Sequence, residues 1–292
     1  MKYINKITRK TTLILLAFGV GACTSIKTET HTSENIEHPT NRVVLRSDIV
    51  WEKLNPARGD NSPQAGTIWG DRNGTAPTGF LAKFKDGFSS PPHIHNVTYR
   101  AVVIKGLIHN DDSKAEEMWL PSGSFWIQPA GEPHITAAKG EENIAYVEID
   151  QGPYLVQPTN EAFDTGARPL NVDAGNIVWL GSKNTSWIAP DNQAEISFLW
   201  ESDASKGLKG LFIKLPKGFS GKLESTGQVL HAVVIQGELR YKIPQTGTLK
   251  LLDAGSYFSS EGKAVHTITT DSESEATVYV RTNGEIRVKA AK

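Results

Sequence analysis

The fold of this chain is decided by PPHIH at residues 91–95, read together with QPAGEPH at residues 128–134. His93 and His95 are one residue apart, so in a strand their side chains point to the same face. The Pro-x-Gly sequence before His134 predicts a turn that brings a second strand back beside the first. Three imidazoles that converge from two neighbouring strands can hold one metal ion and leave coordination positions open. The sequence therefore predicts a metal site inside a small β-barrel.

Landmark residues stand at regular spacing around these stretches. The first run is Gly87-x5-His93-x-His95-x3-Tyr99-x6-Gly106, and the second is Gly123-x5-Pro129-x-Gly131-x2-His134. Together they resemble the two motifs of the cupin superfamily, except that the motif glutamate is missing. Its place is taken by Tyr99 or, if the loop is counted one residue longer, by Arg100. Three unrelated histidines are the alternative, but they would not explain why the turn residues also stand at motif spacing.

The resemblance implies one divalent transition metal bound by His93, His95 and His134, with iron, zinc and manganese not separated by the sequence. Three neutral imidazoles leave the ion its full formal charge of two, whereas a glutamate would cancel one unit. Such a centre favours an anionic ligand such as hydroxide, a carboxylate or an enolate. Arg100 would strengthen this preference if its guanidinium turned inward, and the alternative is that it pairs at the surface.

Four aromatic residues lie near the motifs in the sequence, namely Tyr99, Trp119, Phe125 and Trp126. They either line a pocket over the metal or fill the barrel core, where β-rich folds place large aromatic side chains. Alternation along a strand puts Phe125 and Trp126 on opposite faces. At most half of such a set can therefore face the metal.

Polar residues near the motifs are candidates for proton transfer or for turns. Glu117 and Glu132 are the nearest acidic residues, although Glu132 lies within the Pro-x-Gly turn and can serve the turn instead. His109 follows Gly106 in a polar stretch and is expected to be exposed. Asp111 and Asp112 are expected to be turn residues.

Residues 1–22 are expected to be a lipoprotein signal peptide. Four basic residues precede an apolar stretch at residues 13–20, which is shorter than the roughly 20 residues that span a bilayer. The sequence Val-Gly-Ala before Cys23 resembles a bacterial lipobox, cleaved before a cysteine that becomes lipidated. Cys23 is the only cysteine in the chain, which excludes a disulfide within it. Thr24 follows where an aspartate would imply retention in the inner membrane, so the resemblance implies an outer-membrane anchor facing the periplasm.

The mature chain is expected to be acidic. The formal charge of the whole chain is −1, and cleavage removes four basic and no acidic residues, which leaves −5. This balance, without basic runs, argues against nucleic acid as a partner. Residues 23–45 are rich in Thr, Ser, Glu and Asn and predict a flexible tether, in which His31 and His38 are solvated. The lipid anchor is then the expected contact with a membrane.

The folded part of the chain is an internal repeat. Residues 79–89 align without a gap to residues 210–220, and residues 101–106 align to residues 232–237 at the same offset of 131. Repeats of this length indicate duplicated domains, because the units of a solenoid are far shorter. The expected domains are a first at 46–155, which carries the metal site, a connector at 156–175, and a second at 176–290.

Each repeat is expected to be β throughout. Short β-branched and aromatic runs alternate with Gly, Asp, Asn and Pro turns. The clearest runs are 80–84, 99–104, 125–128, 145–149 and 276–281. No segment keeps a helical apolar period over three turns. The predicted fold class is all-β, with two tandem cupin (jelly-roll, RmlC-like) β-barrel domains.

The second copy has lost most of the site. Glu224 and Thr226 stand where the first copy has its His-x-His pair, while His266 matches the third histidine. His231 lies opposite Arg100. These residues could form a degenerate site, but the Pro-x-Gly turn is also lost, so a structural role is expected.

The folded chain, about residues 46–290, resembles an uncharacterised family of two-cupin proteins related to the ChrR-like cupins. The resemblance rests on Pro92-His93-x-His95, on residues 100–106 and on residues 123–134. It implies the fold and metal binding but no substrate, because cupins host many reactions and pure binding roles. Ring-opening and diketone-cleaving dioxygenases of the superfamily use three-histidine iron sites, so an oxygenase-like enzyme acting on a small anionic or enolisable molecule is one expectation. A non-catalytic protein that binds a small ligand, or in which the metal is structural, is the other. A homo-oligomer is compatible with both.

Overall fold

The computed structural model of the chain describes residues 40–190, 192–202 and 207–291. In these ranges the helices are short 3-10 turns and the remaining regular structure is β-strand, as predicted. The 3-10 turns are η1 (Arg46–Asp48), η2 (Pro56–Asn61), η3 (Thr159–Glu161) and η4 (Ala174–Asn176). No helix in the described ranges has the length and hydropathy needed to cross a membrane. The predicted signal peptide and residues 23–39 of the predicted tether lie outside the described part of the chain.

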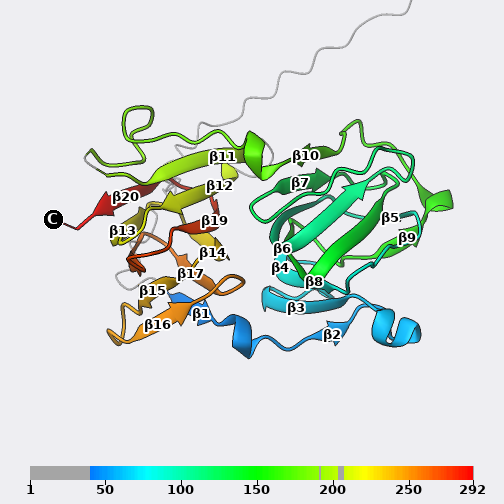
Figure 1. Cartoon of the computed structure of the whole chain (residues 1–292), viewed down its shortest axis with the longest axis horizontal. Helices are drawn as coiled ribbons and strands as arrows, with labels where there is room; N and C mark the ends of the chain where they lie inside the picture. The colour runs from blue at the N-terminus through cyan, green and yellow to red at the C-terminus, as the bar shows by residue number, and fades with distance from the viewer. Residues whose placement is uncertain (1–39, 191, 203–206, 292) are drawn as a thin grey trace, which may run out of the picture. The chain divides into compact units, whose positions relative to one another are not determined.

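The first half of the folded chain forms a seven-stranded antiparallel sheet and a two-stranded sheet (Figure 1). The strands of the larger sheet are β2 (Glu52–Lys53), β3 (Gln64–Trp69), β4 (Thr78–Phe84), β6 (Tyr99–Asp111), β7 (Phe125–Gln128), β8 (Ile135–Ile149) and β10 (Leu170–Val172). Their spatial order is β10-β7-β6-β8-β4-β3-β2. The smaller sheet pairs β5 (His93–His95) with β9 (Val156–Pro158).

The long antiparallel pair of β6 and β8 occupies the middle of the seven-stranded sheet. Its pairing register shifts at Val103, Lys105 and Leu107. Such bulges bend a strand pair and increase its twist. The half of β8 nearer its C-terminus pairs with β4, whereas residues 134 and 137, at its start, are bridged to His93 and Ser89. The bend therefore carries the start of β8 to the strand that bears the first two histidines.

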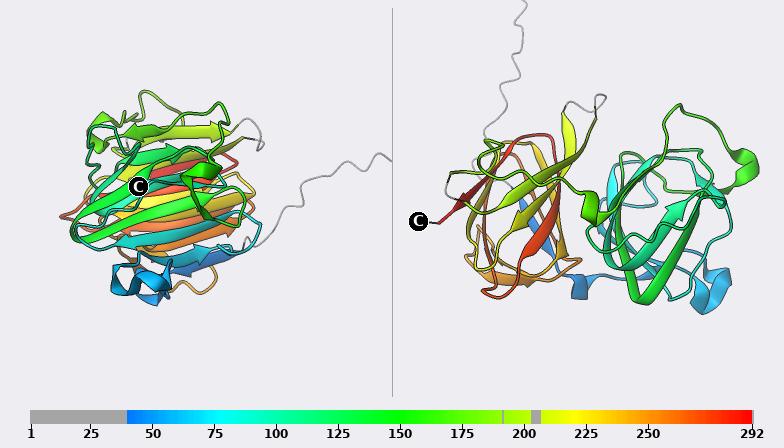
Figure 2. Two further views of the ribbon diagram at one scale, coloured as in Figure 1. Left: turned by 90° about the vertical axis from the view of Figure 1, so that its right-hand side faces the viewer. Right: turned by 45° about the horizontal axis from the view of Figure 1, so that its top comes forward.

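The second half forms a six-stranded and a five-stranded sheet that face each other. The six-stranded sheet contains β1 (Asn41–Val44), β11 (Glu195–Ser202), β12 (Leu208–Leu215), β14 (Val229–Gln236), β17 (Tyr257–Glu261) and β19 (Ala276–Thr282), in the order β1-β17-β14-β19-β12-β11. The five-stranded sheet contains β13 (Ser220–Ser225), β15 (Leu239–Lys242), β16 (Leu249–Leu252), β18 (Ala264–Thr270) and β20 (Ile286–Ala290), in the order β16-β15-β18-β13-β20. The right view of Figure 2 shows both groups of strands, each curved around its own interior.

Two segments pair with strands far from them in the sequence. Asn41–Val44, expected as the end of the flexible tether, forms β1 and pairs with β17 of the second barrel. In the predicted connector, β9 pairs with β5 and β10 pairs with β7 of the first barrel. The prediction of a loose tether is thus wrong at residues 41–44, because a polar run with two valines still offers backbone groups to an open sheet edge.

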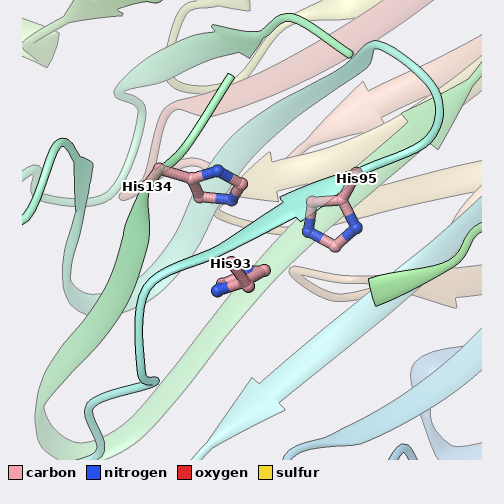
Figure 3. Close-up of side chains that lie close together, drawn as sticks. All are labelled: His93, His95 and His134. Atoms are coloured by element: carbon pink, nitrogen blue, oxygen red, sulfur yellow. The ribbon is translucent and has the colours of Figure 1, made fainter. Parts of the chain in front are cut away.

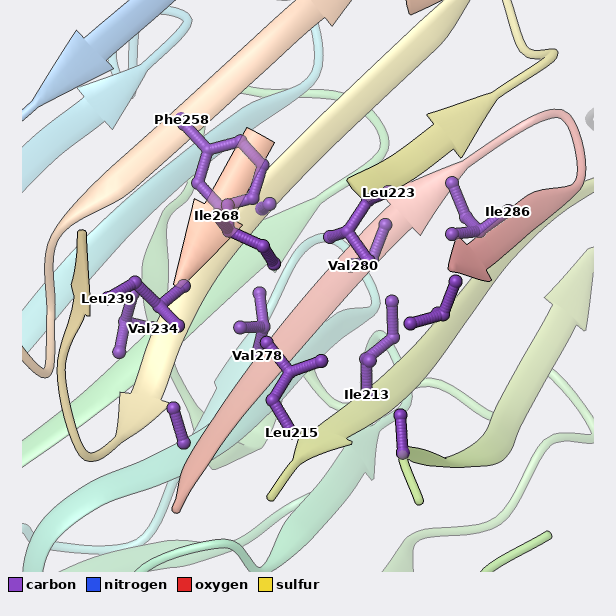
Figure 4. Packing of buried hydrophobic residues seen from close by; sticks show 14 of the residues in the cluster. Ile213, Leu215, Leu223, Val234, Leu239, Phe258, Ile268, Val278, Val280 and Ile286 are labelled. Carbon is purple, nitrogen blue, oxygen red and sulfur yellow. The ribbon is translucent and has the colours of Figure 1, made fainter. Parts of the chain in front are cut away.

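Apolar side chains pack into three buried clusters. One fills the second barrel and includes Ile213, Val234 and Val278 (Figure 4). Another fills the first barrel and includes Phe80. The third lies between the seven-stranded and six-stranded sheets and includes residues of both halves, such as Ile68.

The repeated run Ala-Val-Val-Ile belongs to two of these clusters at once. In the first barrel Ala101 and Val103 face the interior, while Val102 and Ile104 face the other half of the chain. The copy at residues 232–235 alternates in the same way. A strand that is buried on both faces needs apolar residues at every position. This explains why the run is uninterrupted in both copies.

Each half of the chain also contains a contact between a tryptophan and a glycine. Trp69 packs its indole over Gly79 on the neighbouring strand, where a Cβ atom would clash with the ring. Trp200 packs in the same way over Gly210, which is the equivalent of Gly79 in the repeat. Only glycine leaves room for the indole at these two positions. This explains why the tryptophan and glycine pair occurs in both copies of the repeat.

A buried polar network joins the halves. The indole of Trp69 donates to the Tyr146 hydroxyl at 3.0 Å and that of Trp200 donates to the Tyr279 hydroxyl at 2.9 Å. Both hydroxyls then donate to the carboxylate of Glu148, at 2.9 and 2.8 Å. Glu148 is 0% exposed. One buried carboxylate is therefore held from both halves of the repeat.

Candidate metal centre

Three imidazoles of the first barrel converge (Figure 3). His93 and His95 both belong to β5, and their side chains point to the same side of the strand. His134 lies directly opposite His93, since each backbone N–H of this pair donates to the other's carbonyl oxygen at 3.0 Å. The nearest ring nitrogens of the three side chains all lie within 4.8 Å of one another. The predicted convergence of these three residues is therefore present in the fold.

The turn before His134 fixes this register. Gly131 has φ of 76°, a left-handed conformation that side chains disfavour. Its N–H donates to the carbonyl oxygen of His95 at 2.8 Å, which ties the second motif to the first. A Cβ atom at this position would also clash with the Phe163 carbonyl. The Pro-x-Gly sequence thus places the third histidine beside the first two.

Each imidazole is held by its Nδ1 atom. The Nδ1–H groups of His93, His95 and His134 donate to the carbonyl oxygens of Pro91 at 2.9 Å, Leu155 at 2.9 Å and Glu132 at 3.0 Å. A carbonyl oxygen only accepts, so Nδ1 carries the proton and Nε2 keeps its lone pair. This arrangement is typical of histidines that bind metals, because it fixes the ring orientation and raises the basicity of the ligand nitrogen.

Burial keeps these imidazoles neutral. His95 and His134 are 3% and 1% exposed. Burial lowers the pKa of His134 to about 3, with a further contribution from His93, and lowers the pKa of His95 well below its usual range, with contributions from His134 and His93. Burial also lowers the pKa of His93. At neutral pH the three Nε2 lone pairs are therefore free to bind a cation without first losing protons.

Tyr99, which takes the place of the motif glutamate, lies beside the centre. Its hydroxyl is 3.4 Å from Nε2 of His134 and donates to Oδ1 of Asn110 at 2.9 Å. Asn110 donates to Gln128 at 3.0 Å, and Gln128 donates to the Glu132 carbonyl that also holds His134. Burial raises the pKa of Tyr99, so the hydroxyl keeps its proton. Asn110 escaped the sequence analysis, although a polar residue at an inward-facing strand position is a usable signal.

Tyr154 also escaped the sequence analysis. Its hydroxyl lies 3.0 Å from Nε2 of His95, and the two rings stack with centroids 4.2 Å apart. The residue follows β8, at the end of the segment that the sequence assigned to the first domain. No motif contains it, so only the folded chain brings it to the centre.

Arg100 does not face the centre. It follows Tyr99 on β6 and therefore points to the opposite face of the strand. Its guanidinium pairs with Asp150 at 2.9 Å and lies 3.7 Å from the ring centroid of Trp200, in the other half of the chain. The suggestion that Arg100 turns toward the metal is therefore wrong. Arg100 forms an ion pair, as the alternative held, but its own side chain is only 11% exposed.

The two acidic candidates stand outside the centre. Glu132 contributes its backbone carbonyl to His134 and Gln128, while its side chain lines a surface pocket shared with Glu117. Glu117 accepts from the Trp119 indole at 3.0 Å and is exposed. Among the described residues, the group that can hold a cation contains three histidines and no carboxylate.

The expected aromatic set divides between different surroundings. Trp126 lies in the interior of the first barrel near Tyr99, with ring centroids 6.5 Å apart. Phe125 faces the other half of the chain, as alternation predicts. Trp119 lies outside the barrel interior, stacked under Lys139 at 3.7 Å. Only Tyr99 and Trp126 of the four therefore approach the centre.

Comparison with known proteins agrees with this picture. A family model described as a domain of unknown function, DUF4437, matches residues 42–289. The chain belongs to the DUF4437 family. No curated protein matches the sequence.

Solved structures similar to this DUF4437 chain are cupin-type. One is a protein from Nostoc punctiforme provisionally named a dioxygenase, with 13% identity, 87% of this chain and 88% of that chain covered, and a TM-score of 0.65. Another is oxalate decarboxylase from Lactobacillus farciminis, with 11% identity, 86% and 88% covered, and a TM-score of 0.57. A third is vicilin from hazelnut, with 13% identity, 82% and 85% covered, and a TM-score of 0.53. At these identities the likeness shows the fold alone, and it confirms the predicted pair of cupin barrels.

In the second barrel of this DUF4437 chain the expected remnants of a site do not converge. His231 stacks on Trp69 with ring centroids 4.0 Å apart, between the two halves. His266 is buried and hydrogen-bonded to Tyr241 at 2.8 Å. Glu224 pairs with Lys289 at 2.6 Å. Each of these three side chains thus contacts a partner of its own, as expected for residues with a structural role.

His109 differs from its prediction. It is 2% exposed rather than exposed, and its Nδ1 contacts the carbonyl oxygen of Met118 at 3.3 Å. The segment between β6 and β7 covers it, which a polar sequence did not reveal. Asp112 opens a turn as expected, since its carbonyl oxygen accepts from the Ala115 N–H at 2.9 Å, whereas Asp111 is the last residue of β6.

Proposed function

We propose that this DUF4437 protein is a metal-binding bicupin whose first barrel binds one divalent transition metal and a small anionic molecule. The observation that carries the proposal is the set of three Nε2 lone pairs, each oriented by an Nδ1–H bond to a backbone carbonyl. Iron, zinc and manganese all accept three imidazoles. His93, His95 and His134 would hold the ion, and the bound ion would supply Lewis acidity or, if it is iron, redox chemistry.

The preference for an anion follows from charge. The centre offers three neutral imidazoles and, among the described residues, no carboxylate. A divalent ion there keeps a formal charge of two, which an anionic ligand can neutralise in a site where two of the three imidazoles are buried. We propose that the protein catalyses a dioxygenase-like reaction on a small anionic or enolisable molecule. We also propose that it is related to the ChrR-like cupins, on the basis of the same motif residues.

A non-catalytic binding protein is the second candidate. The observation that favours it is that the group able to hold a cation contains no carboxylate among the described residues, while Glu117 and Glu132 border a surface pocket. Without a positioned acid or base, proton transfer would fall to groups supplied by the ligand itself. Binding and release of an anion need no such group.

Elemental analysis of the mature protein, purified without a histidine tag, tests the proposal. We expect about one ion per chain, because the three converging histidines occur in the first barrel alone among the described residues. Iron together with oxygen consumption on an enolisable substrate would support the enzyme, and zinc without turnover would support the binding protein. Two ions per chain, or none after incubation with each metal, would contradict the assignment.

We also propose that the protein is a lipoprotein anchored in the outer membrane through Cys23, which lies outside the described residues. Cys23→Ser should abolish lipidation and move the protein from the membrane fraction to the soluble periplasmic fraction. Ser25→Ala, two residues on, is the matched control and should remain in the membrane fraction. Tight membrane association of the Cys23→Ser protein would disprove the anchor.

A further inference from the structure

Tyr154 has a hydrogen bond that a bound metal must break. Since Nδ1 of His95 donates to Leu155, its Nε2 atom is unprotonated, and the Tyr154 hydroxyl donates to it at 3.0 Å. The two rings stack with an interplanar angle of 19°, so the hydroxyl lies above the imidazole plane, beside the in-plane lone pair that would bind a metal. When a metal ion takes this lone pair, the nitrogen can no longer accept a hydrogen bond and the Tyr154 proton loses its acceptor.

The fold keeps the hydroxyl in place after that loss. Asn96 donates to the Pro153 carbonyl at 3.0 Å and accepts from the Leu155 N–H at 2.9 Å, so it clamps the backbone on both sides of Tyr154. The Tyr154 ring also packs against Phe80, with centroids 5.3 Å apart. The hydroxyl end therefore cannot swing to solvent without breaking several contacts.

The distance between the Tyr154 hydroxyl and His95 places this hydroxyl close to the coordination sphere of a bound metal. A metal lies about 2 Å from a ligating imidazole nitrogen. The Tyr154 oxygen is 3.0 Å from the same nitrogen and lies above the ring plane, so it would lie roughly 3–4 Å from the ion. A ligand atom in an open coordination position falls within hydrogen-bond reach of a group at that distance.

The other phenol near the centre does not offer its proton. Tyr99 already donates to Asn110 at 2.9 Å, and Asn110 is fixed in turn by Gln128 and Thr136. Tyr99 therefore presents lone pairs to the centre, whereas Tyr154 presents a proton once the metal is bound. An anion bound to the metal is stabilised by a hydrogen-bond donor, and of these two tyrosines Tyr154 is the one that can donate.

We propose that Tyr154 determines the specificity of this centre by donating its hydroxyl proton to the exogenous anion bound to the metal. The inference rests on the proposed function and deepens it. The class of ligand it selects is a small monoanion, such as a carboxylate, an enolate or hydroxide, whose metal-bound atom keeps a lone pair toward Tyr154. A neutral ligand that offers no lone pair after binding gains nothing from this hydroxyl.

The test uses cobalt(II)-loaded protein, with azide as the probe and the visible absorption spectrum as the readout. Tyr154→Phe should keep about one ion per chain and an unchanged melting temperature, because the stacked ring is retained. Its azide affinity should fall between about tenfold and a hundredfold, as expected for the loss of a hydrogen bond to a charged group. Affinity for imidazole should change by less than about threefold, since bound imidazole turns an N–H outward.

Two further variants sharpen the result. Tyr99→Phe, which also removes a phenolic hydroxyl near the centre, should weaken azide binding less than Tyr154→Phe does. Asn96→Ala, which releases the backbone around Tyr154, should weaken azide binding in the same direction as Tyr154→Phe while the metal is retained. This second route keeps the test valid if Tyr154→Phe proves unstable.

Equal azide affinity of the wild type and Tyr154→Phe would overturn the inference and leave metal binding intact. Loss of the metal from Tyr154→Phe would also overturn it, because the phenol would then be a ligand. A parallel loss of imidazole affinity would assign Tyr154 a packing role instead. Wild-type protein that takes up no cobalt would refute the proposed function itself, and the inference with it.

Discussion

Replacing His95 with alanine is expected to empty the metal centre at micromolar free metal. The change leaves two imidazoles, which are too few to hold a divalent ion against water. It also removes the partner of Leu155 and of the Tyr154 hydroxyl, so the segment beside the centre loses its contacts. The loss of affinity should exceed the roughly 10- to 100-fold that removal of an outer hydrogen-bond partner costs. Metal content after dialysis against a metal-buffered solution is the measurement.

His109→Ala is the matched control. It removes a buried histidine from the same barrel, and this histidine contacts the Met118 carbonyl rather than the other imidazoles. The control protein should keep about one ion per chain even if its stability falls. Retention of a full ion by His95→Ala would mean that the metal binds elsewhere, and the three-histidine assignment would then be wrong.

The motif residues could be predicted because local geometry determines them. Strand alternation puts His93 and His95 on one face, and the left-handed Gly131 sets the position of His134. Both facts depend on neighbours within a few residues. The repeat likewise revealed the two barrels, because strands buried on both faces, such as the one containing residues 101–104, tolerate few changes.

The surroundings of the centre could not be predicted, because they depend on contacts between distant segments. Tyr154 reaches His95 only because β9 pairs with β5. Arg100 is drawn away from the centre by Trp200 and Asp150, and Trp200 belongs to the other half of the chain. No periodicity in the sequence encodes a partner 100 residues away. The sequence therefore predicts the ligands better than the groups that orient what binds to them.

The contact between the two halves of the chain contains two stacked pairs of side chains that are related by approximate symmetry. Arg100 of the first half stacks on Trp200 of the second at 3.7 Å, and His231 of the second half stacks on Trp69 of the first at 4.0 Å. Arg100 and His231 are equivalent positions of the repeat, as are Trp69 and Trp200. A contact in which each half gives the other the same residue position is the pattern of a two-fold interface. Duplication thus explains why a buried polar network around Glu148 receives equivalent residues, Tyr146 with Trp69 and Tyr279 with Trp200, from the two halves.

Glu148→Ala is expected to lower the free energy of unfolding by about 3–5 kcal/mol, the usual cost of removing one partner from a buried ion pair. Glu148 accepts from Tyr146, from Tyr279 and from Arg281, the last at 3.2 Å. Burial alone would lower the pKa of Arg281, but Glu148 and Asp150 raise it, so the guanidinium stays charged. Without Glu148 this cation keeps Asp150 as an ion-pair partner, at 2.7 Å, and two tyrosine hydroxyls lose their acceptor.

Thermal melting of the metal-free protein measures this effect without interference from ligand binding. The melting temperature of Glu148→Ala should fall on the order of 10 °C. Glu148→Gln, which keeps an acceptor oxygen but loses the charge, should lie between the alanine variant and the wild type. Glu273→Ala, the same change at an exposed position, should melt within about 1 °C of the wild type. If Glu148→Ala also melted within about 1 °C of the wild type, the polar network around Glu148 would contribute nothing to stability. The apolar cluster between the two sheets would then hold the halves together alone.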